Sequence, residues 1–289
     1  MKNNTLKTAA FSILALLFVT INAKAQTEKE LENSIIDSLY IQETENKNKR
    51  AKVLHAEPLY IDLIRDLGAR KGEREWNVGL GLTDKNNYDE YQALIEYEWA
   101  PIDRLGLEVE LPFTLYPSAT NATTPGSKLN GLKLATQYSF FVSEKLKTSM
   151  AIGYIHEFGL TSFNNYGNDK LFTGNTYNPI FIVAKRWGNN FHTLLYTGPV
   201  IEHHFEENST HTSWEINSNF HYMIPGTKNF IGIEFNKEIQ TKDFDMTIRP
   251  QMRVAVAENL LVGIVTGIPV SRENERFSSF LRLIYEPKY

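Results

Sequence analysis

Residues 105–115 read Leu-Gly-Leu-Glu-Val-Glu-Leu-Pro-Phe-Thr-Leu, and every second position from Leu105 to Leu115 carries a large apolar side chain. The positions between them are small, polar or charged: Gly106, Glu108, Glu110, Pro112 and Thr114. Because successive side chains of a strand point to opposite faces, this stretch forms a strand with one apolar face and one acidic face. Its length suits a tilted strand that crosses a bilayer, so the sequence predicts a membrane-spanning strand here.

The same alternation recurs to the end of the chain and predicts twelve strands. We expect them at 75–83, 88–100, 104–116, 129–142, 145–158, 176–187, 190–205, 211–224, 228–239, 243–256, 259–270 and 276–287. Short turns such as Ser143-Glu144 alternate with longer polar loops such as 160–175, as in bacterial outer-membrane barrels. The predicted fold is therefore all-β: a single antiparallel up-and-down transmembrane β-barrel of about 12 strands over residues 75–289, with both termini periplasmic.

Aromatic side chains support a lipid-facing wall. The apolar faces carry aromatic residues near both strand ends, in two groups that resemble the girdles at the lipid headgroups. One group is Tyr97, Trp99, Phe140, Trp187, Tyr222 and Tyr285, and the other is Phe113, Tyr154, Phe158, Tyr177, Trp214, Phe244 and Phe277. The alternative, a secreted β-sandwich, would place its aromatic residues in mid-strand, in the core.

The first residues predict export. Lys2 and Lys7 precede an apolar run at 9–21, and Ala23-Lys24-Ala25 forms a cleavage site, so residues 1–25 are expected to be a signal peptide. Position 26 is not cysteine, so no lipid anchor is expected, and the chain has no cysteine at all. The net charge is −4 and no basic tract occurs, which argues against nucleic acid as a partner.

Residues 26–74 are expected to form a periplasmic arm. Between Gln26 and Arg50, the apolar residues are spaced as in an exposed helix, or in a loosely ordered arm. A second, short helix is predicted at 58–67, because Pro58 is well placed at a helix start and Leu59, Leu63, Ile64 and Leu67 form one apolar stripe. A helix in this position would pack on the barrel mouth or enter the lumen and close it.

The segment HAEPLYIDLIRDLGARKGEREWNVG, residues 55–79, resembles the signature of a family of bacterial outer-membrane β-barrels, and APIDRLGLE at 100–108 fits the same group. The family is in turn distantly similar to transporter-like barrels of phenol-degradation operons (the MetA-pathway type). This resemblance implies an outer-membrane barrel that passes small molecules. It implies no particular substrate and no functional residue.

Charged residues dominate the predicted inward faces. The candidate lumen-lining residues are Glu96, Glu98, Glu108, Glu110, Glu215, Glu234, Glu238, Arg249, Arg253 and Arg282. The three arginines are expected to form a basic sector that faces Glu234 and Glu238. One interpretation is a conduit with acidic and basic walls for polar solutes; the other is a salt-bridge network that fills a narrow barrel.

Histidines near one predicted outer loop suggest two further kinds of site. His203, His204 and His211 flank one predicted outer loop and are weak candidates for a metal site, but a solvated rim is the favoured explanation, because the adjacent residues His203 and His204 of a regular strand point to opposite faces. His211 and Ser213 share a face, as in outer-membrane lipid hydrolases, but no orienting third residue is evident. No phosphate-binding loop and no cofactor motif occurs, so neither a cofactor nor an enzyme is expected.

The sequence thus predicts an outer-membrane barrel of a Gram-negative bacterium, a channel or transporter-like protein for small polar or amphipathic solutes. The alternatives are a barrel with a filled lumen in a structural or interaction role, and, less favoured, a lipid hydrolase. The expected partners are outer-membrane lipid, small-molecule solutes and the barrel-assembly machinery. An aromatic C-terminal residue, Tyr289, following Leu281, Leu283 and Tyr285, resembles the signal that this machinery reads.

Overall fold

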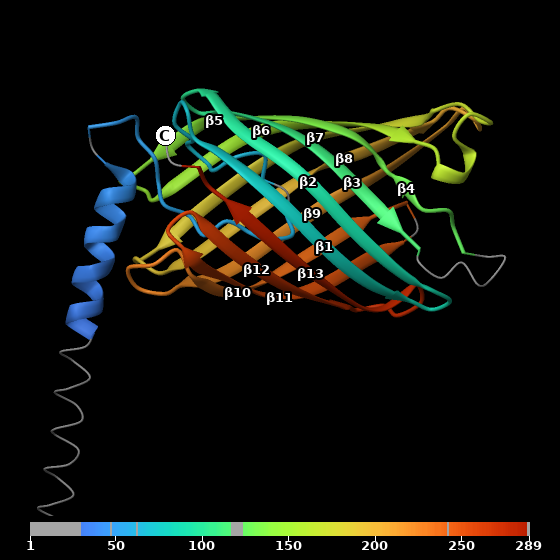
Figure 1. The fold of residues 1–289 in the computed structure, drawn as a ribbon. Coiled ribbons are helices and arrows are strands. Elements are labelled where there is room, and N and C mark those ends of the chain that lie inside the picture. The colour runs from blue at the N-terminus through green and yellow to red at the C-terminus, as the bar shows by residue number, and fades with distance from the viewer. Residues whose placement is uncertain (1–29, 47, 62, 117–123, 242, 288–289) are drawn as a thin grey trace, which may run out of the picture.

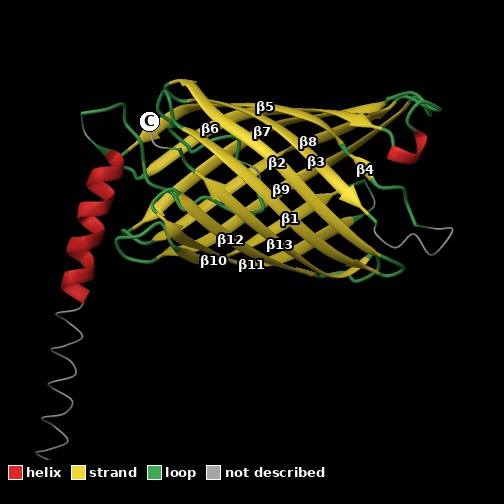
Figure 2. Ribbon diagram, in the orientation of Figure 1, coloured by secondary structure: helices red, strands yellow, loops and turns green. Residues whose placement is uncertain are grey.

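A computed structural model describes residues 30–46, 48–61, 63–116, 124–241 and 243–287, which form a barrel with a helix outside one end (Figures 1 and 2). The predicted signal peptide and Tyr289 lie outside these residues. The strands are β1 (Arg74–Lys85), β2 (Asp89–Ile102), β3 (Leu105–Leu115), β4 (Lys128–Leu129), β5 (Gly131–Ser143), β6 (Thr148–Leu160), β7 (Phe172–Trp187), β8 (Phe191–His204), β9 (Ser209–Met223), β10 (Phe230–Ile239), β11 (Phe244–Ala257), β12 (Leu260–Pro269) and β13 (Glu275–Tyr285). A short 3-10 helix, η1 (Phe163–Asn165), lies between β6 and β7.

The barrel has twelve long strands among the described residues, because β4 is a two-residue pairing on β3 that only Asn130 separates from β5. Each long strand pairs antiparallel with its neighbours along the chain, and β1 closes the barrel by pairing with both β2 and β13. Trp76, for example, lies opposite Tyr97 on one side and Tyr285 on the other. The predicted fold, a closed twelve-stranded antiparallel barrel with a helical N-terminal arm, is therefore confirmed.

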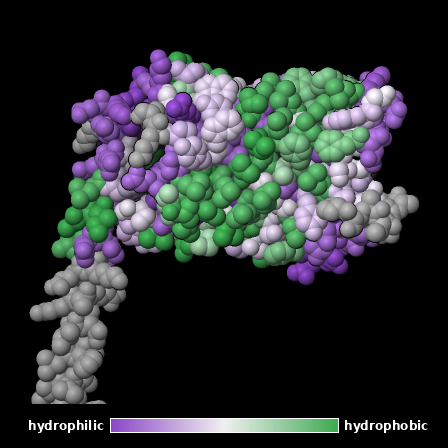
Figure 3. Space-filling model, viewed as in Figure 1, coloured by the Kyte–Doolittle hydropathy of each residue, from purple (hydrophilic) through white to green (hydrophobic). Residues whose placement is uncertain are grey.

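The burial pattern of the strands is the reverse of that in a soluble protein. On β1, Trp76 and Leu80 are 47% and 53% exposed, while the alternating Asn77 is fully buried. Buried positions face a polar lumen, and exposed apolar positions face outward. Figure 3 shows the result on one face: hydrophobic residues cover much of the barrel wall, and hydrophilic residues gather at its two ends. A wall of this kind suits hydrocarbon as its solvent.

The two ends of the barrel differ. The helix at residues 30–45 and the C-terminal end of β13 lie at one end, called here the helix end, together with the short β2–β3, β5–β6 and β7–β8 turns (Figure 1). The longer connection at 161–171 lies at the opposite, loop end, as do the described residues 124–127 before β4. Among the described residues, no helix is long and apolar enough to cross a membrane.

The predicted helix at 58–67 is wrong. The described residues of this span form bends and a turn instead, with Gly68 in a left-handed conformation just after it. A helix would bury one stripe and expose the rest, but Leu59, Ile61, Leu63, Ile64 and Leu67 are all buried. The segment is surrounded by the lumen wall, and side chains of the wall take over the hydrogen bonds that a helix would make within itself.

Candidate functional site

Residues 51–73, called here the plug segment, cross the inside of the barrel at its helix end. Ala56 and Leu59 pack with Phe230 on β10 and with Leu261 and Val265 on β12. Farther along the segment, its buried isoleucines and leucines pack against a second group of inward residues on the opposite wall, on β5 to β8: Ala135, Ala151, Ile155, Ile180, Ile182, Ala184, Leu194 and Tyr196. The plug segment therefore contacts opposite walls and spans the lumen.

Glu234 on β10 is the strongest polar anchor of the plug segment. Its carboxylate accepts hydrogen bonds from three consecutive backbone N–H groups, those of Leu59 (2.9 Å), Tyr60 (3.2 Å) and Ile61 (3.0 Å). Gln251 on β11 donates to the same carboxylate and accepts a second bond from Leu59 N–H at 2.9 Å. This arrangement satisfies backbone donors that have no helix or sheet partner.

Weaker polar contacts hold the rest of the segment. The Gly68 N–H group donates to Ser139 Oγ at 2.9 Å, and the Ala56 N–H group donates to His192 Nδ1 at 3.1 Å. His55 lies beside Ser149, with 3.0 Å between the ring Nε2 and the hydroxyl. Together these contacts distribute the plug segment's backbone hydrogen bonds over several strands.

Ion pairs link the plug segment to the wall. Arg65 contacts Glu75 on β1 at 2.9 Å and Glu98 on β2 at 3.0 Å, as well as Asp66 at 3.0 Å. Lys52 contacts Glu73 at 2.8 Å and also Asp66. Burial opposes ionisation of Asp66, but Arg65 and Lys52 hold its pKa well below its ordinary value. The segment thus carries its own charge network into the lumen.

Two neighbouring groups of the plug segment are shifted toward their neutral forms. Burial, followed by the nearby Asp66, raises the pKa of Glu57 well above its ordinary value, although Arg253 lies 3.3 Å away. Burial, followed by the Arg186 guanidinium, lowers the pKa of His55 to about 3. The plugged lumen therefore disfavours a charge on His55.

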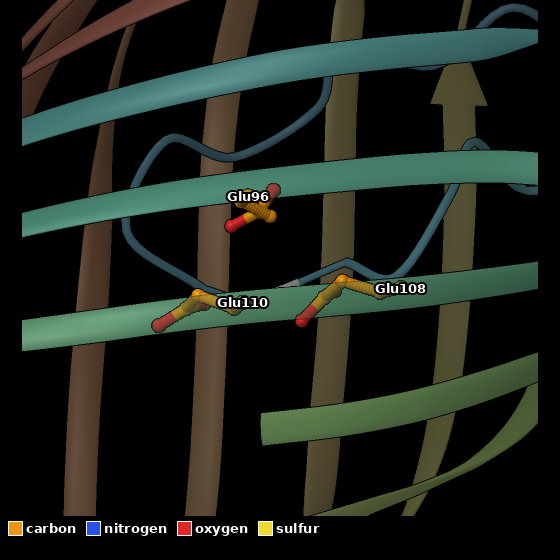
Figure 4. A group of neighbouring side chains, drawn as sticks. All are labelled: Glu96, Glu108 and Glu110. Atoms are coloured by element: carbon orange, nitrogen blue, oxygen red, sulfur yellow. The ribbon is translucent and has the colours of Figure 1, made fainter. Parts of the chain in front are cut away.

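Carboxylates are concentrated on β2 and β3. Figure 4 shows Glu96, Glu108 and Glu110 side by side on these strands, and their carboxylate oxygens lie within 4.8 Å of one another. Arg282 on β13 contacts Glu96 at 2.8 Å, and Lys133 on β5 contacts Glu110 at 2.9 Å and Glu108 at 3.5 Å. These cations compensate much of the cluster's charge.

Asn77 on β1 connects this cluster to the plug segment's ion pairs. Its amide donates to Glu96 at 2.7 Å and to Glu98 at 2.8 Å, and Glu98 is a partner of Arg65. The acidic wall of the lumen and the plug segment therefore share one continuous hydrogen-bonded network.

The plug segment divides the lumen into two hollows with no lining residue in common. A cavity of about 440 Å³ at the helix end is bordered by Lys52, Asp66 and Arg70 of the plug segment. A cavity of about 530 Å³, called here the loop-end vestibule, has Tyr60 and Ile61 of the plug segment in its lining. A void of only about 20 Å³ remains beside Glu57, Pro58 and Arg65. The described residues of the plug segment thus lie between two separately lined cavities.

The predicted lumen residues all belong to the strands, but their grouping differs from the prediction. Glu215 and Glu238 line the loop-end vestibule together with Arg249, while Glu234 anchors the plug segment instead of pairing with an arginine. Arg282 contacts Glu96, so it is part of the acidic network. Arg282 also lies in one register row with Arg253, with Gly263 of β12 between them. The predicted arginines are thus neighbours that have different partners, Glu96 for Arg282 and Glu57 for Arg253.

The histidine candidates remain at the rim. His203 lies 3.2 Å from the Thr210 hydroxyl, and His204 and His211 are exposed. The metal-capable group found among the described residues is that of the three glutamates in Figure 4, so these histidines gain no support. Ser213 is buried, and within the described part of the chain it has no hydrogen bond to a histidine.

Sequence reasoning missed the residues that close the lumen. The sequence does not single out Arg65, Lys52 or Gln251, because the alternation pattern assigns strand residues to faces and says nothing about contacts with the arm. Inward-facing glycines gave a signal. A Cβ at Gly263 would lie 2.5 Å from Leu59 Cδ2, and one at Gly106 would lie 2.5 Å from Arg65 Cβ. Glycine in a strand often marks such a close approach.

Comparisons with known proteins agree with this architecture. Among solved structures, the COG4313 outer-membrane channel from Pseudomonas putida F1 is 16% identical, with a TM-score of 0.59, and the alignment covers 78% of this chain and 100% of that chain. The NanC porin (9% identity, TM-score 0.52, 74% and 100% covered) and the KdgM porin (14%, 0.51, 73% and 99%) are similar too. At these identities the likeness concerns the fold.

No curated protein matches the chain in sequence. A family model does match, over residues 51–286, a range that includes the whole plug segment and every strand of the barrel. On this match the chain belongs to the HAEPLYID-like family.

Proposed function

We propose that this protein is an outer-membrane channel for small polar or amphipathic solutes, and that its plug segment closes the lumen at rest and moves when solutes pass. The observation that carries the proposal is a cavity on each side of a plug segment whose described residues form no helix and no strand. The apolar outer wall supports a membrane location, and the structural neighbours are channels.

The cellular placement is part of the proposal. Residues 1–25 would direct export, the helix end and both termini would face the periplasm, and the assembly machinery would insert the barrel. The family's distant likeness to barrels of phenol-degradation operons supports passage of small molecules and names no substrate.

The balance of forces favours a mostly closed lumen. Five large apolar side chains of the plug segment are buried, and each such burial stabilises by roughly 1.5–3 kcal/mol, so the packing term is on the order of 10 kcal/mol. Against it, the amide nitrogen and the amide oxygen of Asn219 are enclosed without a hydrogen-bond partner among the described residues, each at a cost of about 1–3 kcal/mol. Water in an open lumen would satisfy these groups, so moving the plug segment costs less free energy than the packing term alone suggests.

An engineered disulfide tests whether the plug segment moves. A Cβ at Gly263 on β12 would lie 3.2 Å from Leu59 Cγ, and in a disulfide one sulfur lies about 3 Å from the partner's Cβ. Leu59→Cys with Gly263→Cys should therefore cross-link the plug segment to the wall, and the chain has no native cysteine to interfere.

Planar-bilayer recordings of the double variant give the readout. The reduced form should open more often than the native protein, because Leu59→Cys also removes packing, and the oxidised form should be silent. Each single variant, oxidised in the same way, is the matched control and should keep conducting. If the oxidised double variant conducts like the reduced one, plug movement is not needed.

A barrel with a permanently filled lumen is the second candidate, because a plug segment packed against opposite walls fits it equally well. Silence of the native protein and of the reduced double variant would reject the channel and support this structural or interaction role.

A further inference from the structure

Arg249 on β11 is held in place by neutral groups alone. Its Nε donates to Asn236 Oδ1 at 2.8 Å, and its Nη1 donates to Ser278 Oγ at 3.1 Å. Its guanidinium carbon lies 3.5 Å from the centre of the Tyr60 ring, which belongs to the plug segment. A Cβ at Gly267 would lie 2.4 Å from Nη1, so this glycine leaves the space that the guanidinium occupies.

The guanidinium has no carboxylate partner among the residues that the structure describes, although the side chain is only 7% exposed. Glu234 lies opposite it in the β10–β11 register, but that carboxylate is occupied by the backbone of the plug segment. A buried charge is costly unless it is paired, so an arginine fixed in position without a counter-charge points to an anion from outside the protein.

One edge of this guanidinium remains available. Nη2 makes no hydrogen bond to the described residues, and it is not among the enclosed polar atoms. Arg249 lines the loop-end vestibule, a cavity of about 530 Å³, together with Tyr60. A guanidinium edge presented to a cavity is suited to bind a carboxylate.

The opposite charge stands farther toward the loop end. Glu215, Glu238 and Asp245 are register partners on β9, β10 and β11, and they form one row of carboxylates across three strands. All three border the same vestibule, and no ion pair of theirs occurs within the described ranges. Asp245 is four residues from Arg249, or roughly 13 Å along a strand before the side chains reach toward each other.

We propose that the loop-end vestibule binds small zwitterionic solutes, with the solute carboxylate on Arg249 and its ammonium group toward the row of Glu215, Glu238 and Asp245. The row repels a simple anion, and Arg249 repels a simple cation, so a solute that carries both charges at opposite ends fits best. Because Arg249 stacks on Tyr60, a solute bound there also touches the plug segment. The proposal deepens the proposed channel function but does not require conduction to be observed.

Ligand-observed NMR on the detergent-solubilised protein tests the proposal without measuring transport. The probe is 4-aminobutyrate, compared with butyrate and butylamine, which carry one of its two charges each. We expect 4-aminobutyrate to bind at least tenfold more tightly than either, and Arg249→Gln to weaken it at least tenfold. Arg276→Gln is the matched control, since Arg276 is an exposed arginine of β13 that pairs with Asp84, and it should change nothing.

Heat-modified gel migration shows whether Arg249→Gln folds. If it does not fold, further variants keep the test decisive. Arg249→Lys keeps the charge but loses the forked donors, and should bind several-fold more weakly. Glu238→Gln combined with Glu215→Gln should reduce the preference for 4-aminobutyrate over butyrate.

Absent binding of 4-aminobutyrate, equal binding of butyrate or butylamine, or unchanged binding by Arg249→Gln would each overturn this inference. Conduction without such binding would support the channel proposal and overturn the zwitterion site. Binding without conduction would support the zwitterion site and contradict the channel proposal.

Discussion

The Glu234 carboxylate offers the sharpest test of how the lumen is closed. Glu234→Gln keeps the side chain's shape and removes its charge. In the native protein this carboxylate accepts from the backbone N–H groups of Leu59, Tyr60 and Ile61. The glutamine variant retains one acceptor oxygen, but its NH₂ group must face donors that it cannot bind.

The size of the effect follows from these contacts. A hydrogen bond to a charged group contributes about 1.5–3 kcal/mol, and the variant loses at least one such bond and weakens the others. These values are already net of the hydrogen bonds that the N–H groups make with water when the plug segment leaves. We therefore expect closure to weaken by about 3 kcal/mol, which raises the ratio of open to closed channels on the order of a hundredfold.

Two assays measure this ratio. The first is the open probability in planar bilayers. The second is the rate at which a water-soluble maleimide labels Leu59→Cys, which is buried in the closed state. Glu238→Gln is the matched control: it lies on the same face of β10, lines the vestibule and has no bond to the plug segment among the described residues.

The barrel itself should tolerate the change. The β9–β10 and β10–β11 ladders depend on backbone pairing, so Glu234→Gln should show native heat-modified migration. If open probability and labelling rate stay within twofold of the control in a folded protein, Glu234 does not hold the plug segment, and our account of closure is wrong.

Three further predictions concern the plug segment. The pKa of His55 in the folded protein, about 3, lies below its unfolded value near 6.5. The stabilisation from neutral His55 is therefore intact above pH 6.5 and is lost as pH falls toward 3, by up to about 1.4 kcal/mol per pH unit. His55→Gln should flatten the acid side of the maleimide-labelling profile. Arg65→Gln leaves Glu98 without its cation, should weaken closure by about 3 kcal/mol, and should raise open probability; equal gating of variant and native protein would contradict this. Gly106→Ala places a methyl group 2.5 Å from Arg65 Cβ and should displace the plug segment but not the barrel, seen as faster labelling with unchanged migration.

The barrel could be predicted because its signal is local and repeated. The strand expected at 104–116 is β3, Leu105–Leu115, and its inward glutamates are buried as the alternation requires. Each strand is predicted from its own two-residue alternation, so a wrong boundary in one strand does not affect the prediction of the others. The span expected at 129–142 shows the limit, because the structure interrupts it at Asn130.

The grouping of lumen charges could not be predicted from single strands. Arg282 and Glu96 are far apart in sequence and meet because β1 lies between β13 and β2. Closure implies this neighbourhood, but the distance across a lumen depends on side-chain reach and on what fills the space. Sorting charges by sequence position therefore placed Arg282 near Arg253 but did not predict its contact with Glu96.

The helix predicted at 58–67 is wrong for a deeper reason. An apolar stripe predicts a helix only when one face is buried and the other is wet, and a segment enclosed by a lumen is buried on every side. Its backbone is then free to follow the wall, provided the wall supplies acceptors, as Glu234 and Ser139 do. The glycines at 106 and 263 are the complement of this path, since each leaves room for a plug side chain. Wall and plug segment are therefore complementary in both hydrogen bonding and shape, which neither sequence pattern reveals when it is considered alone.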